Sequence, residues 1–336
     1  MQNTSCSQSF DVKREKNGTD AAQGGLDFPH TATINVLGHN IKVKNYICSS
    51  DGINYGVKDK ARIQLTIIPT SFCPCSCPFC IAHANRNDKA VLDVNKLEKT
   101  LISLRKNDVI RGIKITGGEP MLLPDLVSDI IDMIYDIWGD KYFEVSLDTS
   151  GVDLDGLLRI KKLSCLDQVH ISRHHYDDEI NRSIFGAAVP DMKELKAAIR
   201  SVSYRDLFVM NCMLMKDYIG SREEIHKYLD HAIDIGVGKV SFITGNPINS
   251  FIAGQALDYA ALINEDDPAY MFTRGYFDYD ICRCRDGVYV SGNGDLIEFY
   301  GKCTVKDSGA DYARGLVYRP DNRLTCGYGG EEIYHA

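Results

Sequence analysis

The sequence lacks the features of a membrane or secreted protein. Among its 336 residues, no apolar run approaches the ~20 residues that a membrane-spanning helix needs. The first 25 residues mix Asn, Ser, Lys and Gly, and they contain no hydrophobic core of the kind that a secretory signal carries. We therefore expect a cytoplasmic protein that does not contact a membrane.

Positive charge is also scarce. Lys and Arg total 38 against 46 Asp and Glu, which gives a formal net charge of −8. Proteins that bind nucleic acid through its phosphates usually carry a basic surface, so we expect no broad nucleic-acid binding. The chain has no internal repeat, and its 44% hydrophobic and 25% charged residues are ordinary for a globular protein. These values exclude disordered, collagen-like and coiled-coil chains.

Cysteine, in contrast, is abundant, with twelve residues in the chain. Disulfides are rare in a reducing compartment, so clustered cysteines there indicate metal ligands or catalytic groups. The spacing of these cysteines therefore carries most of the functional information in the sequence.

Hydrophobic periodicity predicts alternating strands and helices between residues 62 and 243. Stretches of helical period separate six apolar, β-rich runs, at residues 63–68, 113–116, 143–147, 169–172, 208–214 and 240–243. This alternation is typical of βαβ units and a parallel sheet. Six strands are too few for a closed eight-stranded barrel. We therefore predict an α/β fold, a partial (β/α)6 TIM-like barrel.

Composition divides the chain into four parts. Residues 1–28 are polar and turn-prone, which predicts a flexible tail. Residues 29–60 have the pattern of a β hairpin that turns at Gly38-His39-Asn40. The barrel is expected over residues 61–249. In residues 250–336 the alternation stops and Gly, Tyr and Asp are frequent, so we predict an irregular C-terminal extension.

Three cysteines with the spacing C-x3-C-x2-C follow the first barrel strand. They are Cys73, Cys77 and Cys80. Three thiolates on a short loop suit one face of a [4Fe-4S] cube, and they leave one iron open, as a catalytic metal centre requires. The alternative is a zinc site that also uses Cys75, although zinc modules usually place their ligand pairs on two separated knuckles. In the three-cysteine register Cys75 is a spectator.

This loop, with Phe79 before its last cysteine, resembles the radical S-adenosylmethionine (radical SAM) superfamily. A second segment, Gly117-Gly118-Glu119-Pro120 at the end of the second strand, resembles the family's GGEP motif. The resemblance implies that this segment holds the methionine amino group of SAM. Its glycines allow a ligand to approach the backbone closely. The pattern is nearest to the branch of the molybdopterin-precursor cyclase and the SPASM-type enzymes.

The resemblance implies further SAM contacts at the ends of later strands. The candidates are Asp148, Ser172, Arg173 and Asn211. Arginine suits a carboxylate because it forms bidentate hydrogen bonds, and the alternative is that Arg173 is a solvated residue of the barrel rim. His174 and His175 end the fourth strand and are candidate substrate-binding residues.

The resemblance also implies an enzyme whose cofactors are a [4Fe-4S] cluster and SAM. In this family SAM is cleaved reductively to methionine and a 5′-deoxyadenosyl radical, which removes a hydrogen atom from the substrate. We expect a small-molecule, nucleotide or sugar substrate in a biosynthetic pathway, and an electron donor such as flavodoxin or ferredoxin. The alternatives are a peptide-modifying enzyme with an auxiliary cluster and a non-catalytic iron–sulfur redox sensor. A sensor has no use for a SAM pocket.

Three cysteines of the extension, Cys282, Cys284 and Cys303, raise the question of a second cluster. Relatives of the cyclase hold an auxiliary [4Fe-4S] cluster with a C-x2-C pair and a third cysteine. This chain has C-x-C instead. An altered second cluster, a zinc site and a hairpin that has lost its cluster are the three interpretations. In the last of these, Cys303 is a candidate hydrogen donor to the substrate radical.

Overall fold

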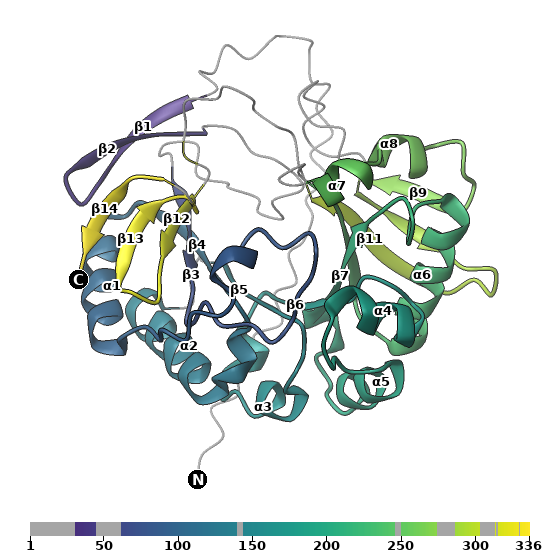
Figure 1. Cartoon of the computed structure of the whole chain (residues 1–336), viewed down its shortest axis with the longest axis horizontal. Coiled ribbons are helices and arrows are strands. Elements are labelled where there is room, and N and C mark those ends of the chain that lie inside the picture. The colour runs from purple at the N-terminus through teal and green to yellow at the C-terminus, as the bar shows by residue number, and fades with distance from the viewer. Residues whose placement is uncertain are drawn as a thin grey trace, which may run out of the picture.

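A large curved sheet with helices along its outer side dominates the computed structural model (Figure 1). The structure describes residues 31–44, 62–139, 144–245, 250–273, 286–302, 313, 315–328 and 330–336. The sheet has twelve strands in the order β14-β13-β12-β3-β4-β5-β6-β7-β8-β11-β10-β9. No helix of the described residues is long and apolar enough to cross a membrane.

Six neighbouring strands run parallel and follow chain order. They are β3 (Ile63–Ile67), β4 (Ile110–Ile115), β5 (Glu144–Thr149), β6 (Gln168–Ser172), β7 (Phe208–Leu214) and β8 (Lys239–Thr244). Each coincides with one of the six apolar runs of the sequence. The prediction of an α/β fold built on six βα strands is thereby confirmed.

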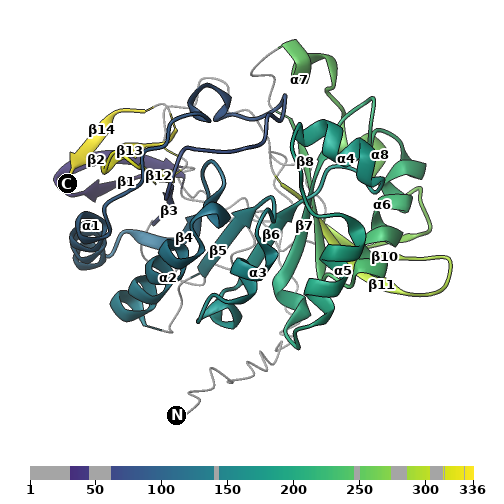
Figure 2. The ribbon, with the colours of Figure 1, turned by 60° about the horizontal axis from the view of Figure 1, so that its bottom comes forward.

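Helices connect these strands and cover one face of the sheet (Figure 2). They are α1 (Val94–Asn107), α2 (Pro124–Trp138), α3 (Leu154–Leu158), α4 (Asp178–Phe185), α5 (Met192–Arg200) and α6 (Arg222–Ile235), followed by the short α7 (Ser250–Gly254) and α8 (Tyr259–Leu262). Local chemistry fixes their ends. Asp93 caps α1 by accepting hydrogen bonds from two backbone N–H groups, and Gly236 ends α6 in the left-handed region with φ 95°.

The two faces of the parallel strands have opposite character. One set of alternating side chains, such as Leu65, Ile113 and Val145, is buried in a single core with the helix residues Leu101 and Ile130. The intervening side chains point away from the helices because successive residues of a strand alternate between its faces. Cross-strand pairing places polar residues on this inner face, and they include Thr66, Lys114, Ser146, Gln168, Asn211 and Ser241.

The described part of the C-terminal extension is more regular than expected. β11 (Leu296–Lys302) pairs parallel with β8, and β12 (Gly315–Tyr318) pairs parallel with β3. The remaining strands are antiparallel, namely β9 (Tyr270–Thr273), β10 (Asp286–Val290), β13 (Arg323–Cys326) and β14 (Glu332–His335). The extension thus lengthens the sheet at both edges (Figure 1), which corrects the expectation of irregular structure. The parallel pairings join segments that are far apart in the chain, so no local periodicity predicts them.

The N-terminal hairpin forms a separate two-stranded sheet of β1 (Thr31–Val36) and β2 (His39–Lys44). Its turn lies at Leu37 and Gly38, both with positive φ, and not at residues 38–40 as predicted. Two such residues in sequence match the twist of a two-residue hairpin turn. The boundaries of the four predicted parts stay predictions, and the tail 1–28 lies outside the described residues.

Candidate functional site

The cysteine loop begins directly after β3, at the carboxyl end of the parallel strands. Two backbone hydrogen bonds fix its path. The N–H of Cys73 donates to the carbonyl of Arg86 over 2.9 Å, and the N–H of Ser76 donates to the carbonyl of Phe185 over 2.7 Å. Phe185 ends α4, so the loop is held both by its own return segment and by the helix after β6.

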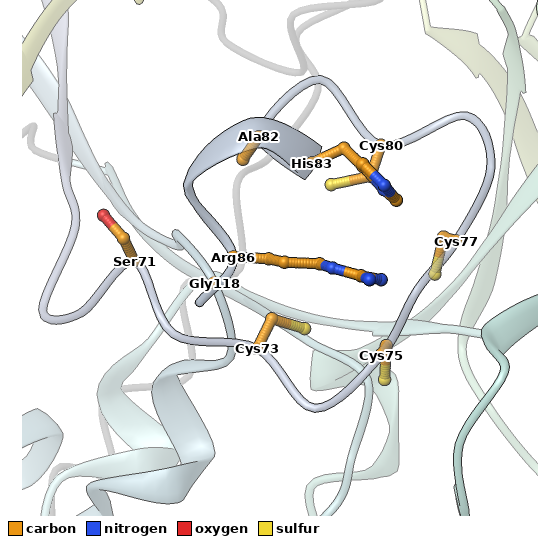
Figure 3. Close-up of a pocket in the computed structure, with 9 residues that line it drawn as sticks. All are labelled: Ser71, Cys73, Cys75, Cys77, Cys80, Ala82, His83, Arg86 and Gly118. Carbon is orange, nitrogen blue, oxygen red and sulfur yellow. The ribbon is translucent and has the colours of Figure 1, made fainter. Parts of the chain in front are cut away.

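The predicted cysteines meet around one pocket (Figure 3). Its lining residues are Ser71, Cys73, Cys75, Cys77, Cys80, Ala82, His83, Arg86 and Gly118. The pocket therefore joins the cysteine loop to the predicted SAM turn. Among the described residues, no three His, Cys, Asp or Glu side chains surround a common position for a single metal ion. A four-cysteine zinc ion would require such a convergence.

The thiols of the pocket differ in their electrostatics. Burial raises the pKa of Cys77 to about 12 and also raises the pKa of Cys80, and the positive charge of Arg86 opposes the shift in both. A hydrogen bond with Cys75 is the main cause that lowers the pKa of Cys73, with Arg86 acting in the same direction. The pocket thus holds a cation that favours thiolates, which are the form in which cysteine binds metals.

Cys75 is more deeply buried than the other three cysteines. Its side chain is 5% exposed and packs in a small apolar cluster with Phe185 and Val189. A hydrogen bond with Cys73 and burial both raise the pKa of its thiol. These contacts favour the interpretation that Cys75 packs the loop and is not a ligand.

The Gly117-Gly118 turn lies against the start of the cysteine loop. The N–H of Gly118 donates to the carbonyl of Thr70, and the N–H of Glu119 donates to the carbonyl of Phe72, each over 2.9 Å. A Cβ on Gly118 would lie 2.1 Å from the Phe72 oxygen, so no larger residue fits there. Gly117 has φ +143°, a conformation that L side chains rarely adopt. The two glycines are thus required for different reasons.

Glu119 is a buried anchor, with 1% of its surface exposed. Its carboxylate accepts hydrogen bonds from the hydroxyls of Thr149 and Ser150 and from the backbone N–H groups of Ser150 and Met121. These contacts join the ends of β4 and β5. Pro120 is buried in the 3-10 turn Pro120–Leu122 that leads to α2. The structure therefore gives Glu119 a role in shaping the turn, and SAM binding by it stays a prediction.

Ser172 and Arg173 lie on opposite faces at the end of β6. Ser172 pairs with Asn211 on the inner face. The guanidinium of Arg173 is 1% exposed and lies between helices, where it donates to Asp178, the Tyr176 carbonyl and His231 Nε2. These partners occupy Arg173, and its burial excludes the alternative of a solvated rim residue. The geometry does not support the prediction that Arg173 holds the SAM carboxylate.

His174 packs against Phe79 of the cysteine loop. The His174 ring meets Phe79 edge-on at 4.7 Å and stacks on Phe185 at 5.0 Å between centroids. Its Nδ1 accepts a hydrogen bond from the backbone N–H of Met213 over 3.1 Å. Burial lowers the pKa of His174 to about 3, so the ring is neutral. His174 supports the loop, which gives no geometric basis for a substrate contact.

His175 is equally buried, at 5% exposure. Its Nδ1 accepts a hydrogen bond from the Asp177 N–H over 3.0 Å, and its ring packs on Tyr176. Both contacts belong to the segment that leads into α4. The two histidines are therefore structural neighbours of the site, and the substrate role predicted for them is not supported by these contacts.

Asn211 is the predicted residue whose environment most suits a ligand. It is 4% exposed on the inner face of β7, and its Oδ1 has no hydrogen-bond partner among the described residues. Ser241, opposite it on β8, is also buried and lies beside Tyr300 of β11. Buried polar atoms in native proteins are nearly always paired, so the Oδ1 of Asn211 indicates a polar ligand.

Asp148 belongs to a polar network that sequence reasoning missed. Its carboxylate lies 3.3 Å from Lys114 Nζ and 2.6 Å from His170 Nδ1. His170 Nε2 in turn lies 3.1 Å from the hydroxyl of Tyr300, a residue of β11. In the sequence, the position of His170 two residues before Ser172 was the one sign that His170 faces inward. No sequence pattern indicated Tyr300, because only the added strand β11 brings it to the barrel.

The remaining predicted residues, Cys282, Cys284 and Cys303, lie outside the described residues. The hairpin expected between them is present, since β10 and β11 pair antiparallel from Val290 and Leu296 onward. A second cluster and a hydrogen-donating Cys303 stay predictions.

The part of the chain that contains this pocket matches a known family. The family model of the radical SAM superfamily matches residues 67–229. These residues, just under half of the chain, thus match a radical SAM domain. The match spans both the cysteine loop and the Gly117-Gly118 turn, so the resemblance seen in the sequence is confirmed. Members of this superfamily use a [4Fe-4S] cluster and SAM.

The curated relatives that match these residues share one name. A "Probable GTP 3′,8-cyclase" of Saccharolobus islandicus is 30% identical over 190 residues, covering 55% of this chain and 58% of the relative. The protein of the same name from Sulfurisphaera tokodaii is 32% identical over 187 residues, covering 55% and 56%. The match thus spans somewhat more than half of each relative. It agrees with the predicted similarity to the cyclase branch.

One solved structure supports the fold across more of the chain. Streptococcus suis SuiB bound to S-adenosylmethionine aligns with a TM-score of 0.53, covering 81% of this chain and 63% of that one at 12% identity. At this identity the likeness concerns the fold alone.

The residues present fit both cofactors of the superfamily. Three thiols and one guanidinium share a pocket, which suits an anionic iron–sulfur cluster. The unpaired Oδ1 of Asn211 offers an acceptor on the inner face of the sheet. Gly118 leaves no room for a side chain between the turn and the loop. The described residues therefore include a pocket lined by thiols and a buried acceptor on the inner face of the sheet, which suit the two cofactors.

Proposed function

We propose that this protein is a radical SAM enzyme that removes a hydrogen atom from a small polar metabolite in a biosynthetic reaction. The observation that carries the proposal is the shared pocket of Cys73, Cys77, Cys80 and Gly118. It joins the predicted cluster ligands to the predicted SAM turn. When bound, the cluster and SAM supply an electron and a carbon radical strong enough to attack an unactivated C–H bond.

In this proposal the chain's own residues act mainly by positioning. Cys73, Cys77 and Cys80 hold the cluster and leave one coordination position for SAM. The backbone of Gly117 and Gly118 approaches the methionine amino group. Ser172 and Asn211, paired on neighbouring strands, offer a hydroxyl and an amide to the polar groups of SAM. Holding reactants in a fixed geometry is a large part of what a protein contributes to such chemistry.

A polar substrate is supported by the inner face of the sheet. Lys114, Asp148, His170 and Tyr300 form a connected hydrogen-bonding network there, a few residues before the strand ends that carry the site. Such groups suit the hydroxyl, amide or phosphate groups of a nucleotide or sugar. GTP is the first compound to test, because the curated relatives are named for it. The C-x-C pair of this chain differs from the cyclase pattern, so other nucleotides and sugar nucleotides belong in the same screen.

The test is anaerobic reconstitution with iron and sulfide, followed by reduction in the presence of SAM. We expect a brown protein that releases 5′-deoxyadenosine. Deuterated GTP and a panel of deuterated sugar nucleotides are then compared for transfer of deuterium into 5′-deoxyadenosine by mass spectrometry. The variant with Cys73, Cys77 and Cys80 changed to Ala is the control. A colourless zinc-containing protein would overturn the proposal.

A further inference from the structure

Arg86 is a charged side chain that lacks an ordinary partner. Its guanidinium makes no ion pair or hydrogen bond with the part of the chain that the structure describes. Figure 3 shows its side chain crossing the pocket between Cys73 and Cys80, with its end toward Cys77. A guanidinium directed into a pocket lined by thiols and not toward a carboxylate indicates an anionic group that the pocket is built to receive.

The backbone holds Arg86 at this position. The 3-10 turn His83–Asn85 reverses the chain after Cys80, and the Arg86 carbonyl then accepts the hydrogen bond from the N–H of Cys73. Arg86 is therefore tied directly to the first of the three cysteines. This pairing distinguishes it from Lys89, an exposed residue of the same segment, whose ammonium lies 5.5 Å from the centre of the Phe72 ring.

We propose that Arg86 is the counter-charge of the iron–sulfur cluster and raises its reduction potential. The proposal rests on the proposed function, because it requires a cluster on Cys73, Cys77 and Cys80. Three thiolates give such a cluster a net negative charge, and reduction adds one more negative charge. Cluster potentials depend on net charge and surroundings. A fixed positive charge in the pocket favours the reduced form, which is the form that delivers the electron.

The size of the effect follows from electrostatics at short range. In a partly exposed pocket, where the effective dielectric is near 20, two charges a few ångströms apart interact by more than the free energy of a tenfold change. Removal of one charge therefore lowers the reduced fraction at a fixed potential at least tenfold, a downward shift of at least about 59 mV for a one-electron couple. A charge on the exterior of the same loop is screened by water and salt, so its removal shifts the potential far less.

The experiment is a potentiometric titration of the reconstituted full chain, followed by electron paramagnetic resonance of the reduced cluster. The variants are Arg86→Gln, Arg86→Lys and Lys89→Gln. We expect the potential of Arg86→Gln to fall by at least about 59 mV, the tenfold change above. Arg86→Lys should keep most of the wild-type potential, and Lys89→Gln should match the wild type although it loses the same charge. Iron content and SAM affinity are measured on each sample.

Several results would overturn the inference. An Arg86→Gln variant with full iron and an unchanged potential removes the proposed role. Weakened SAM binding at an unchanged potential assigns Arg86 to the SAM carboxylate instead. If Arg86→Gln does not retain the cluster, wild-type iron in Arg86→Lys still supports a counter-charge, whereas equal loss in both variants contradicts it. A wild-type protein that binds no cluster would overturn the proposed function itself, which the iron count shows separately.

Discussion

The two faces of the parallel sheet are made by the same strands but serve different purposes. The outer face is buried against α1, α2 and α6 and is almost wholly apolar. The inner face carries the network of Lys114, Asp148 and His170, together with Asn211, whose Oδ1 has no partner in the part of the chain that the structure describes. Burial of the outer face stabilises the fold by the hydrophobic effect. The inner face can therefore carry polar residues that bind ligands.

Two adjacent residues at the end of β6 point to opposite faces of the sheet. Ser172 and Arg173 are neighbours in sequence, and both were candidates for SAM binding. The strand turns Ser172 inward, while Arg173 points outward to Asp178 and His231. A change at one should therefore alter ligand binding, and a change at the other should alter stability.

The largest effect is expected when Cys73, Cys77 and Cys80 are all changed to Ala. Cluster binding and 5′-deoxyadenosine formation should both be abolished, because no nearby residue replaces the thiolates. Iron analysis and mass spectrometry measure the two results. Continued 5′-deoxyadenosine formation would contradict the site. If about four irons per chain remain, a second cluster is present elsewhere, and Cys282, Cys284 and Cys303 become its expected ligands.

Gly118→Val should disrupt the mouth of the barrel without disturbing the outer core. The new Cβ would lie 2.1 Å from the Phe72 oxygen and 2.3 Å from the Ser71 oxygen, so the cysteine loop must move. We expect loss of SAM binding and a lower cluster content, measured by anaerobic titration and visible absorbance. Gly254→Ala is a matched control, since a Cβ there meets no atom within 4 Å. Normal SAM affinity in Gly118→Val would show that the turn is not part of the site.

Arg173→Leu should affect stability more than binding. The Arg173 side chain is buried but its partner Asp178 is 33% exposed, so the loss comes mainly from hydrogen-bond partners left unsatisfied and should be about 1–3 kcal/mol of unfolding free energy. Denaturant unfolding measures this loss, and SAM titration of the folded protein should give nearly the wild-type affinity. If the stability is unchanged and SAM binding is lost, Arg173 contacts SAM and our assignment of its face is wrong.

Ser172→Ala is the matched change on the inner face. Loss of one hydroxyl that no described partner requires should alter the unfolding free energy by no more than about 0.5 kcal/mol. SAM affinity should fall by about tenfold, the effect of one lost hydrogen bond of about 1.4 kcal/mol. Denaturant unfolding and SAM titration are measured for both Ser172→Ala and Arg173→Leu, so the two variants compare the two faces of the sheet directly. Equal SAM affinity in Ser172→Ala and the wild type would remove Ser172 from the site.

The smallest effect is expected for Cys75→Ala. Cys75 packs against Phe185 and Val189, and loss of its sulfur should cost about 1 kcal/mol of stability. The cluster should keep its full iron, because the other three cysteines complete the motif. Loss of iron in this variant would show that the ligand register includes Cys75.

The parallel strands and their helices were predictable because each has a strong local pattern. α1 and α6, for example, have regular apolar stripes and polar caps at their starts. The cysteine loop and the Gly117-Gly118 turn were predictable because their residue types are contiguous in sequence. Arg86 and Tyr300 were not predictable, since each reaches the site through a chain reversal or an added strand that leaves no local signal.

The sequence by itself determined the six parallel strands and the resemblance to the radical SAM superfamily, and it predicted the three thiol ligands. Each of these features is encoded in a short contiguous segment, by its hydrophobic periodicity or by the spacing of its residues. The tertiary structure alone decided which polar residues face inward. Ser172 and Arg173 are equally polar, and only the register of β6 against β7 separates them. It also decided that the extension completes both edges of the sheet, because parallel pairing joins segments that are far apart in the chain.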